Sequence, residues 1–301
     1  MTVRRLLALL SIAAIAVVVA GCGGNGVAAG PDLTSFASAA SASAASDTGR
    51  FELEVELSLP GTDKSFGLSA SGGFDTPNHR AQMALDMSAL AQLMAGFGQS
   101  LGGTSTGDLP TDPESWRLEA IQDGDTVYVR FPLLDDKLPA GKTWIKGSAK
   151  ELAAQSGSEL GQLGSFADTD PRDTFAYLKA VSGSIETVGG ESVRGVDTTH
   201  YRATIDMTKV TSMLPAEQRQ SLGSLDTLLG QSGLSAIPLD VWLDAEQRVR
   251  KLELSFELGG MGSQQAGASL TMEMYDYGEP LDVSLPPADQ VVDAATLKKN
   301  P

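Results

Sequence analysis

The chain has 301 residues, of which 42% are hydrophobic and 6% aromatic, and its formal net charge is −16. A surface this acidic repels phosphate groups, which excludes nucleic acid as a partner. Because Cys22 is the only cysteine, the folded body has no disulfide, no thiolate metal site and no cysteine nucleophile. A chain of this length can bury a sufficient hydrophobic core without them.

The N-terminal residues have the charge and hydropathy pattern of a secretory signal. Arg4 and Arg5 precede an uncharged apolar run, 6–20, which is shorter than the roughly 20 residues of a membrane span. The run ends on the sequence VAGC, which resembles the bacterial lipobox, in which the cysteine is lipidated and becomes the new N-terminus. We therefore predict a signal peptide over 1–21, lipidation of Cys22, and a location at the extracytoplasmic face of the cell membrane.

The residues after the signal are expected to form a short tether and one domain. Without residues 1–21 the chain keeps 20 basic and 38 acidic side chains, so anionic headgroups repel it and membrane attachment depends on the acyl chains. Residues 22–31 are rich in Gly and Ala, which predicts a flexible tether, and 32–301 are assigned to a single domain. Asp32 is placed to cap an Ala/Ser-rich helix that ends near Ser46, with a longer tether as the alternative.

Alternation of apolar and polar residues is clearest from Phe51 to Leu59. A period of two predicts a strand with one buried and one solvated face, as in an antiparallel sheet covered on one side. Hairpin turns are expected at Asp123-Gly124 and Gly189-Gly190. Further strands are expected at 65–74, 80–87, 118–121, 126–131, 142–146, 185–188, 196–206, 237–243, 248–258 and 268–277.

Helical spacing of apolar residues predicts helices at 88–97, within 148–180 and within 207–230. The Gly- and Ser-rich stretch 98–115 is expected to be a long loop. Strands with helices inserted in blocks indicate an α+β fold, in which helices pack on one face of one large antiparallel sheet.

Side chains suited to catalysis or metal binding are sparse. Residues 98–102 match G-x-S-x-G, but the stretch lacks the preceding strand and following helix that a nucleophile elbow needs at Ser100. His79 and His200 are the only histidines, and neither has a second ligand at metal-binding spacing. His200 is expected at the surface, on the polar side of its strand, and residues 123–125 lack the remaining ligands of a calcium loop. We therefore predict a non-enzyme without cofactor or metal.

Three later segments extend the likeness to a known family: LPAGKTW (138–144), DTTHYR (197–202) and IPLDVWLD (237–244). With the lipobox and the strand from Phe51, they resemble actinobacterial envelope lipoproteins of the LppX/LprA/LprF/LprG type. The resemblance implies a LolA-like fold, in which a half-barrel sheet has helices across its concave face. It also implies a lipid, lipoglycan or lipopeptide bound in the cavity, and no catalytic residue.

The apolar face of such a sheet is either filled by helices as an ordinary core or left open as a cavity, and periodicity does not separate the two. The favoured function is a lipid or lipoglycan carrier. The alternatives are an envelope sensor that binds a protein partner on the same fold, and a hydrolase acting through Ser100. The side chains expected to line or floor the cavity are Leu53, Val55, Leu57, Met83, Leu85, Leu252, Leu254 and Phe256.

Overall fold

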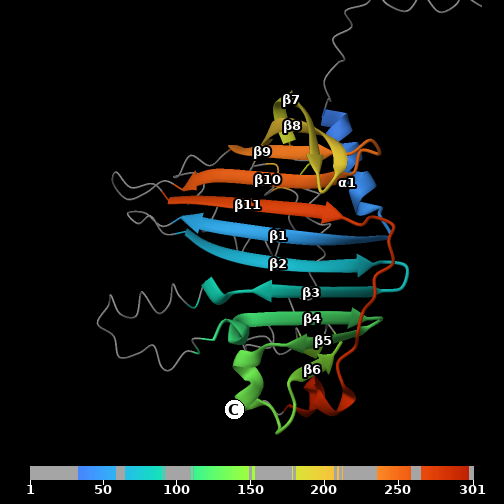
Figure 1. Ribbon diagram of the computed structural model, residues 1–301, viewed down its shortest axis with the longest axis vertical. Helices are drawn as coiled ribbons and strands as arrows, with labels where there is room; N and C mark the ends of the chain where they lie inside the picture. The colour runs from blue at the N-terminus through green and yellow to red at the C-terminus, as the bar shows by residue number, and fades with distance from the viewer. Residues whose placement is uncertain are drawn as a thin grey trace, which may run out of the picture.

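The computed structural model describes residues 33–58, 65–89, 91, 110, 112–148, 151–152, 178, 181–206, 209, 212, 236–258 and 266–297. Within these residues, 12 strands form one sheet, in the spatial order β12-β6-β5-β4-β3-β2-β1-β11-β10-β9-β8-β7 (Figure 1). The strands are β1 (Thr48–Ser58), β2 (Ser65–Asp75), β3 (Arg80–Asp86), β4 (Arg117–Asp123), β5 (Thr126–Arg130), β6 (Trp144–Gly147), β7 (Val181–Val193), β8 (Val196–Asp206), β9 (Ala236–Leu243), β10 (Val249–Leu258), β11 (Ala266–Tyr275) and β12 (Val291–Asp293).

The first strand, β1, lies near the middle of the sheet. It pairs with β2 on one side and with β11 on the other, so that β1 to β6 extend in one direction and β11 to β7 in the other. The pairs are antiparallel apart from β12 and β6, which run parallel. The sheet is open, with β7 and β12 at its two edges. The predicted α+β fold, built on one large antiparallel sheet, is confirmed.

Alternation in β1 separates the two faces of the sheet as expected. Phe51 is buried, whereas Glu52, Glu54 and Glu56 are exposed. Because successive side chains of a strand point to opposite faces, the pairing partners of β1 continue an apolar face and a polar face across the neighbouring strands.

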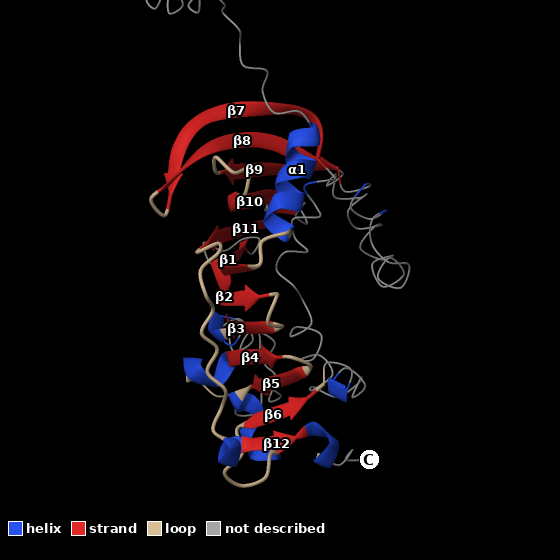
Figure 2. Cartoon of the chain, turned by 90° about the vertical axis from the view of Figure 1, so that its right-hand side faces the viewer, coloured by secondary structure: helices blue, strands red, loops and turns tan. Residues whose placement is uncertain are grey.

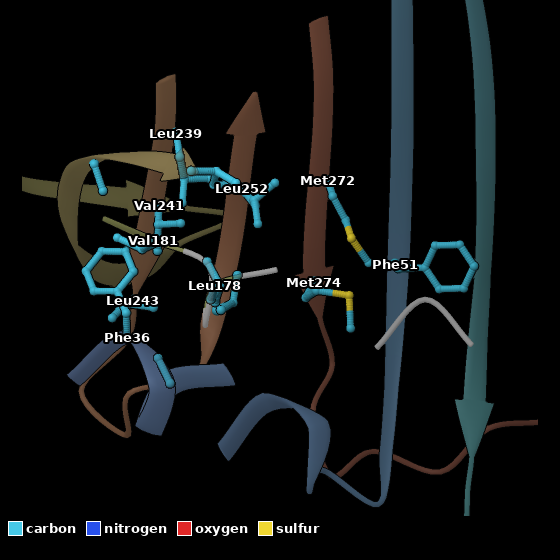
Figure 3. Packing of buried hydrophobic residues seen from close by; sticks show 14 of the residues in the cluster. Phe36, Phe51, Leu178, Val181, Leu239, Val241, Leu243, Leu252, Met272 and Met274 are labelled. Atoms are coloured by element: carbon cyan, nitrogen blue, oxygen red, sulfur yellow. The ribbon is translucent and has the colours of Figure 1, made fainter. Parts of the chain in front are cut away.

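Helix α1 (Leu33–Ala44) packs on the apolar face near β7 and β10 (Figure 2). Its Phe36 and Ala39 are fully buried, and they join a core cluster formed with β1, β2 and β7 to β11 (Figure 3). A second cluster lies at the other end of the sheet, over β4 to β6 and β12. Four 3₁₀ segments complete the described elements: η2 (Pro113–Trp116), η3 (Pro132–Lys137), η5 (Ala288–Gln290) and η6 (Ala294–Thr296). Among the described residues, no helix has the length and apolar character that a membrane crossing requires.

Two predicted turns are displaced in the structure. The turn expected at Gly189-Gly190 is wrong: β7 continues through both glycines with a shift of register, and the chain reverses at Arg194-Gly195. The φ angles there are 48° and 80°, the positive values that a tight two-residue hairpin needs. The other hairpin reverses at Gly124-Asp125, one residue later than expected.

Several expectations fall on residues outside the described ranges. These include most of the predicted helices in 88–97, 148–180 and 207–230, and most of the predicted loop 98–115. The last residues of that loop are described, and η2 begins there at Pro113.

Candidate functional site

The predicted cavity residues come together on the apolar face, in rows that cross the centre of the sheet. Side chains that pair directly across antiparallel strands point to the same face. From β1 through β11 to β10 the rows are Leu53/Met272/Leu252, Val55/Leu270/Leu254 and Leu57/Ala268/Phe256. The side chain of Phe256 is outside the described residues, and its backbone pairing places it in the third row.

The apolar face continues through β2 to β3. Ala70 of β2 pairs with both Leu53 and Leu85, and Gly72 lies opposite Met83. The structure therefore brings the eight predicted positions onto one face, although they come from three strands that are separated in the sequence, β1, β3 and β10.

Burial decreases along this face, away from the filled cluster. Leu252 is 1% exposed and belongs to the core, whereas Leu57 is 37% exposed. Leu57 and the half-buried apolar side chains beside it form a set that we call the central strip. It consists of Val55 and Leu57 of β1, Leu68 of β2, Leu254 of β10 and Leu270 of β11.

Gly72 of β2 makes room for the ring of Phe51, which fills the apolar face next to the central strip. A Cβ atom on Gly72 would lie 2.8 Å from the ring of Phe51 and 2.3 Å from the carbonyl oxygen of Gln82. The missing side chain lets the Phe51 ring extend from β1 over β2, as Figure 3 shows. The Phe51 end of the apolar face is therefore filled, and exposure rises toward the opposite end of β1.

Two hollows formed by described residues lie over the polar face, with volumes of about 480 and 380 Å³. Both are lined by Ser71, Ala84 and Arg117, and the first is also lined by the carboxylates of Glu52, Glu54, Asp86 and Glu273. Ionised walls of this kind are suited to polar or charged groups, because hydrocarbon cannot replace their water. These hollows therefore do not form the predicted acyl-chain cavity.

The tip of the β7–β8 hairpin reaches over this polar face, on the side of the sheet away from α1 (Figure 2). Arg194 forms ion pairs with Glu52 of β1 and Glu273 of β11, and its Nε lies 2.6 Å from the Glu273 carboxylate. Its guanidinium also lies 4.1 Å from the centre of the Tyr275 ring. These contacts join the outermost hairpin to the middle of the sheet.

His200 lies on the polar side of β8, but the prediction that it sits at the surface is wrong. It is 6% exposed, because its ring stacks on Trp242 at 4.1 Å and the two strands beside β8 supply carboxylates. Its Nδ1 lies 3.0 Å from Glu191 and its Nε2 lies 2.6 Å from Asp240. Hydrogen bonds from the Trp242 indole and from His200 lower the pKa of the Glu191 carboxyl. This network joins β7, β8 and β9.

Of the other candidates, those that the structure describes, His79 and residues 123–125, do not assemble into a catalytic or metal site. His79 is exposed in the β2–β3 turn, and residues 123–125 form the β4–β5 turn. Ser100 lies outside the described residues. Within the part of the chain that the structure describes, no group of three or more His, Cys, Asp or Glu side chains could hold a metal ion.

Comparisons with known proteins give distant likenesses. No family model matches the chain. An uncharacterized 31.2 kDa protein from the rplA–rplJ intergenic region of Streptomyces griseus is 27% identical over 160 residues, which are 53% of this chain and 50% of that protein. The chain thus matches about half the length of this curated relative.

Similar solved structures include two mycobacterial proteins, one of them described as a lipoprotein. LppX from Mycobacterium tuberculosis has a TM-score of 0.41 at 15% identity, over 84% of this chain and 97% of that one. LprF from Mycobacterium bovis has a TM-score of 0.43 at 12% identity, over 84% and 96% of the two chains. A LolA superfamily protein from Nitrosomonas europaea has a TM-score of 0.26 at 11% identity, over 84% and 94%.

Proposed function

We propose that this chain is an exported lipoprotein, held at the membrane by an acylated Cys22, that binds the hydrocarbon part of a lipid or lipoglycan on the central strip. The observation that supports the proposal is the incomplete burial of the strip. Its side chains lie in register across four neighbouring strands, yet Leu57 is 37% exposed. Apolar side chains gathered in this way favour contact with hydrocarbon over contact with water.

The dimensions of the strip suit an acyl chain. Four strands at about 4.8 Å spacing span roughly 14 Å, and the residues along each strand add several ångströms more. Each methylene group that leaves water contributes about 0.8 kcal/mol to binding. A chain of a dozen or more methylenes would thus be retained even when only part of it contacts the strip.

Lipid extraction tests the proposal on non-acylated protein that is expressed without residues 1–22. We expect mass spectrometry to find co-purifying lipid, and we expect Val55→Gln to reduce its amount several-fold by placing an amide on the central strip. Glu54→Gln is the matched control, because it introduces the same side chain one residue away on the polar face.

Equal lipid loading of the two variants would contradict binding on this face. If the unsubstituted protein carries no lipid, the proposed function as a lipid carrier is excluded. Recovery of a protein cross-linked to an introduced cysteine at Leu57, with no lipid bound, would instead support the sensor or interaction module.

A further inference from the structure

Helix α1 has a defined direction on the apolar face. Near its start, Phe36 meets Tyr201 of β8 edge to face, with ring centroids 6.0 Å apart. Near its end, Ser43 accepts a hydrogen bond of 2.8 Å from the backbone nitrogen of Val249, the first residue of β10. The helix therefore starts at the β7–β8 end of the sheet and runs toward the centre (Figures 1 and 2).

The length of chain between Cys22 and α1 limits where an anchor can hold the molecule. Ten residues, and therefore eleven Cα–Cα steps, separate Cys22 from Leu33, the first residue of the helix. They reach at most about 40 Å when fully extended, and roughly 18 Å as a flexible coil. The sheet itself spans about 53 Å from β7 to β12 at the usual strand spacing. An anchor at Cys22 therefore holds the β7 end close to the membrane.

The edge strand β7 carries two acidic side chains and no basic one, so charge alone does not favour it as a contact for headgroups. Its 13 residues include two carboxylates, Glu186 and Glu191, and Glu191 is hydrogen bonded to Trp242 and His200. Val188, on the same strand, is 43% exposed. Zwitterionic headgroups carry no net charge, so the two carboxylates do not prevent this edge from approaching them.

The irregular pairing of β7 disfavours a second copy of the chain as the occupant of this edge. Its register with β8 shifts between Ser182 and Glu186 and again between Thr187 and Gly189. Such bulges interrupt the straight row of backbone groups that edge-to-edge pairing of two sheets requires.

We propose that the outer edge of β7 faces the lipid surface, and that the sheet stands on the membrane with β12 farthest from it. This orientation rests on the acylated Cys22 of the proposed function. It identifies the β7 edge around Val188 as a membrane-contacting surface and leaves the β12 edge to face away from the bilayer.

Site-specific fluorescence quenching tests the orientation in the full, acylated chain. Because Cys22 is the only cysteine and its thiol is consumed by the lipid, Val188→Cys gives a single labelling site. Leu285→Cys is the matched control, since Leu285 is 48% exposed and precedes η5 and β12 at the opposite end of the sheet. Each labelled protein is incorporated into phosphatidylcholine–phosphatidylglycerol vesicles that contain a nitroxide-headgroup lipid.

We expect quenching at position 188 to exceed quenching at position 285 by at least threefold. Ser184→Cys, a second exposed position on β7, should behave like position 188. Equal quenching at both ends, or stronger quenching at position 285, would overturn the orientation. Vesicle flotation of the unlabelled chain separates the two hypotheses. A chain that does not float refutes the anchor and the orientation together, whereas a floating chain with uniform quenching refutes the orientation alone.

Discussion

At the scale of single residues, one buried carboxylate organises the turn between β9 and β10. Asp244 is 3% exposed and accepts hydrogen bonds from the backbone nitrogens of Glu246 and Arg248, at 3.0 and 2.8 Å. Its other oxygen accepts from the side chains of Arg248 and Arg250, at 3.0 and 2.8 Å. Arg250 is itself only 8% exposed, so its charge depends on this partner.

We predict that Asp244→Ala lowers the free energy of unfolding by about 3–5 kcal/mol, because it leaves a buried guanidinium without its counter-charge. Urea denaturation measures the change. Glu253→Ala is the control, since Glu253 pairs with Lys251 at a partly exposed site, where such pairs contribute less than about 1 kcal/mol. If the free energy of unfolding falls by the same amount in both variants, the buried contacts of Asp244 do not stabilise the turn more than an exposed ion pair does.

At the scale of elements, the alternation of apolar residues was sufficient to predict the strands from Phe51 to Asp86 and from Ile237 to Tyr275. The same pattern in β2 and β11 could have added Leu68 and Leu270 to the candidate site. The turn at Arg194-Gly195 was missed, because glycine pairs occur in bulges as well as in turns and arginine seldom adopts a positive φ. The contacts of His200 could not be predicted, since strand pairing brings Glu191 and Asp240 beside it. The partners of Asp244 lie within six residues along the chain, but the alternation of apolar residues does not indicate a buried carboxylate there.

The β7–β8 hairpin is held over the polar face by Arg194, and this contact has a measurable local effect. We predict that Arg194→Ala increases hydrogen–deuterium exchange of the β7 and β8 amides at least threefold. We also expect it to change the global free energy of unfolding by less than about 1 kcal/mol, because the pairs with Glu52 and Glu273 are partly exposed.

Arg80→Ala serves as the comparison, because it removes the exposed ion pair with Asp123 at the β2–β3 and β4–β5 turns. Its effect on exchange should be confined to those turns. Unchanged exchange of β7 in Arg194→Ala would show that the His200 network holds the hairpin without the arginine.

At the scale of the whole molecule, the predicted anchor has a direct test. We expect Cys22→Ala to accumulate as an unprocessed precursor that incorporates no labelled fatty acid, because cysteine supplies the only sulfur that can be acylated. Gel mobility and metabolic labelling measure both effects. Normal processing of the variant would refute the lipobox assignment and would leave the lipid-extraction test, which uses protein without residues 1–22, unaffected.

The strand order has a consequence for how cargo would be exchanged. Along the sheet, three strand spacings, about 14 Å, separate β7 from β10, the nearest strand of the central strip, and the hairpin tip at Arg194 reaches back to β1 only on the polar face. If β7 rests on the headgroups, a hydrocarbon chain lodged against β1 has left the bilayer along its entire length. A soluble acceptor could then collect it from the anchored protein without touching the membrane, and desorption from the donor leaflet would be the slow step of loading.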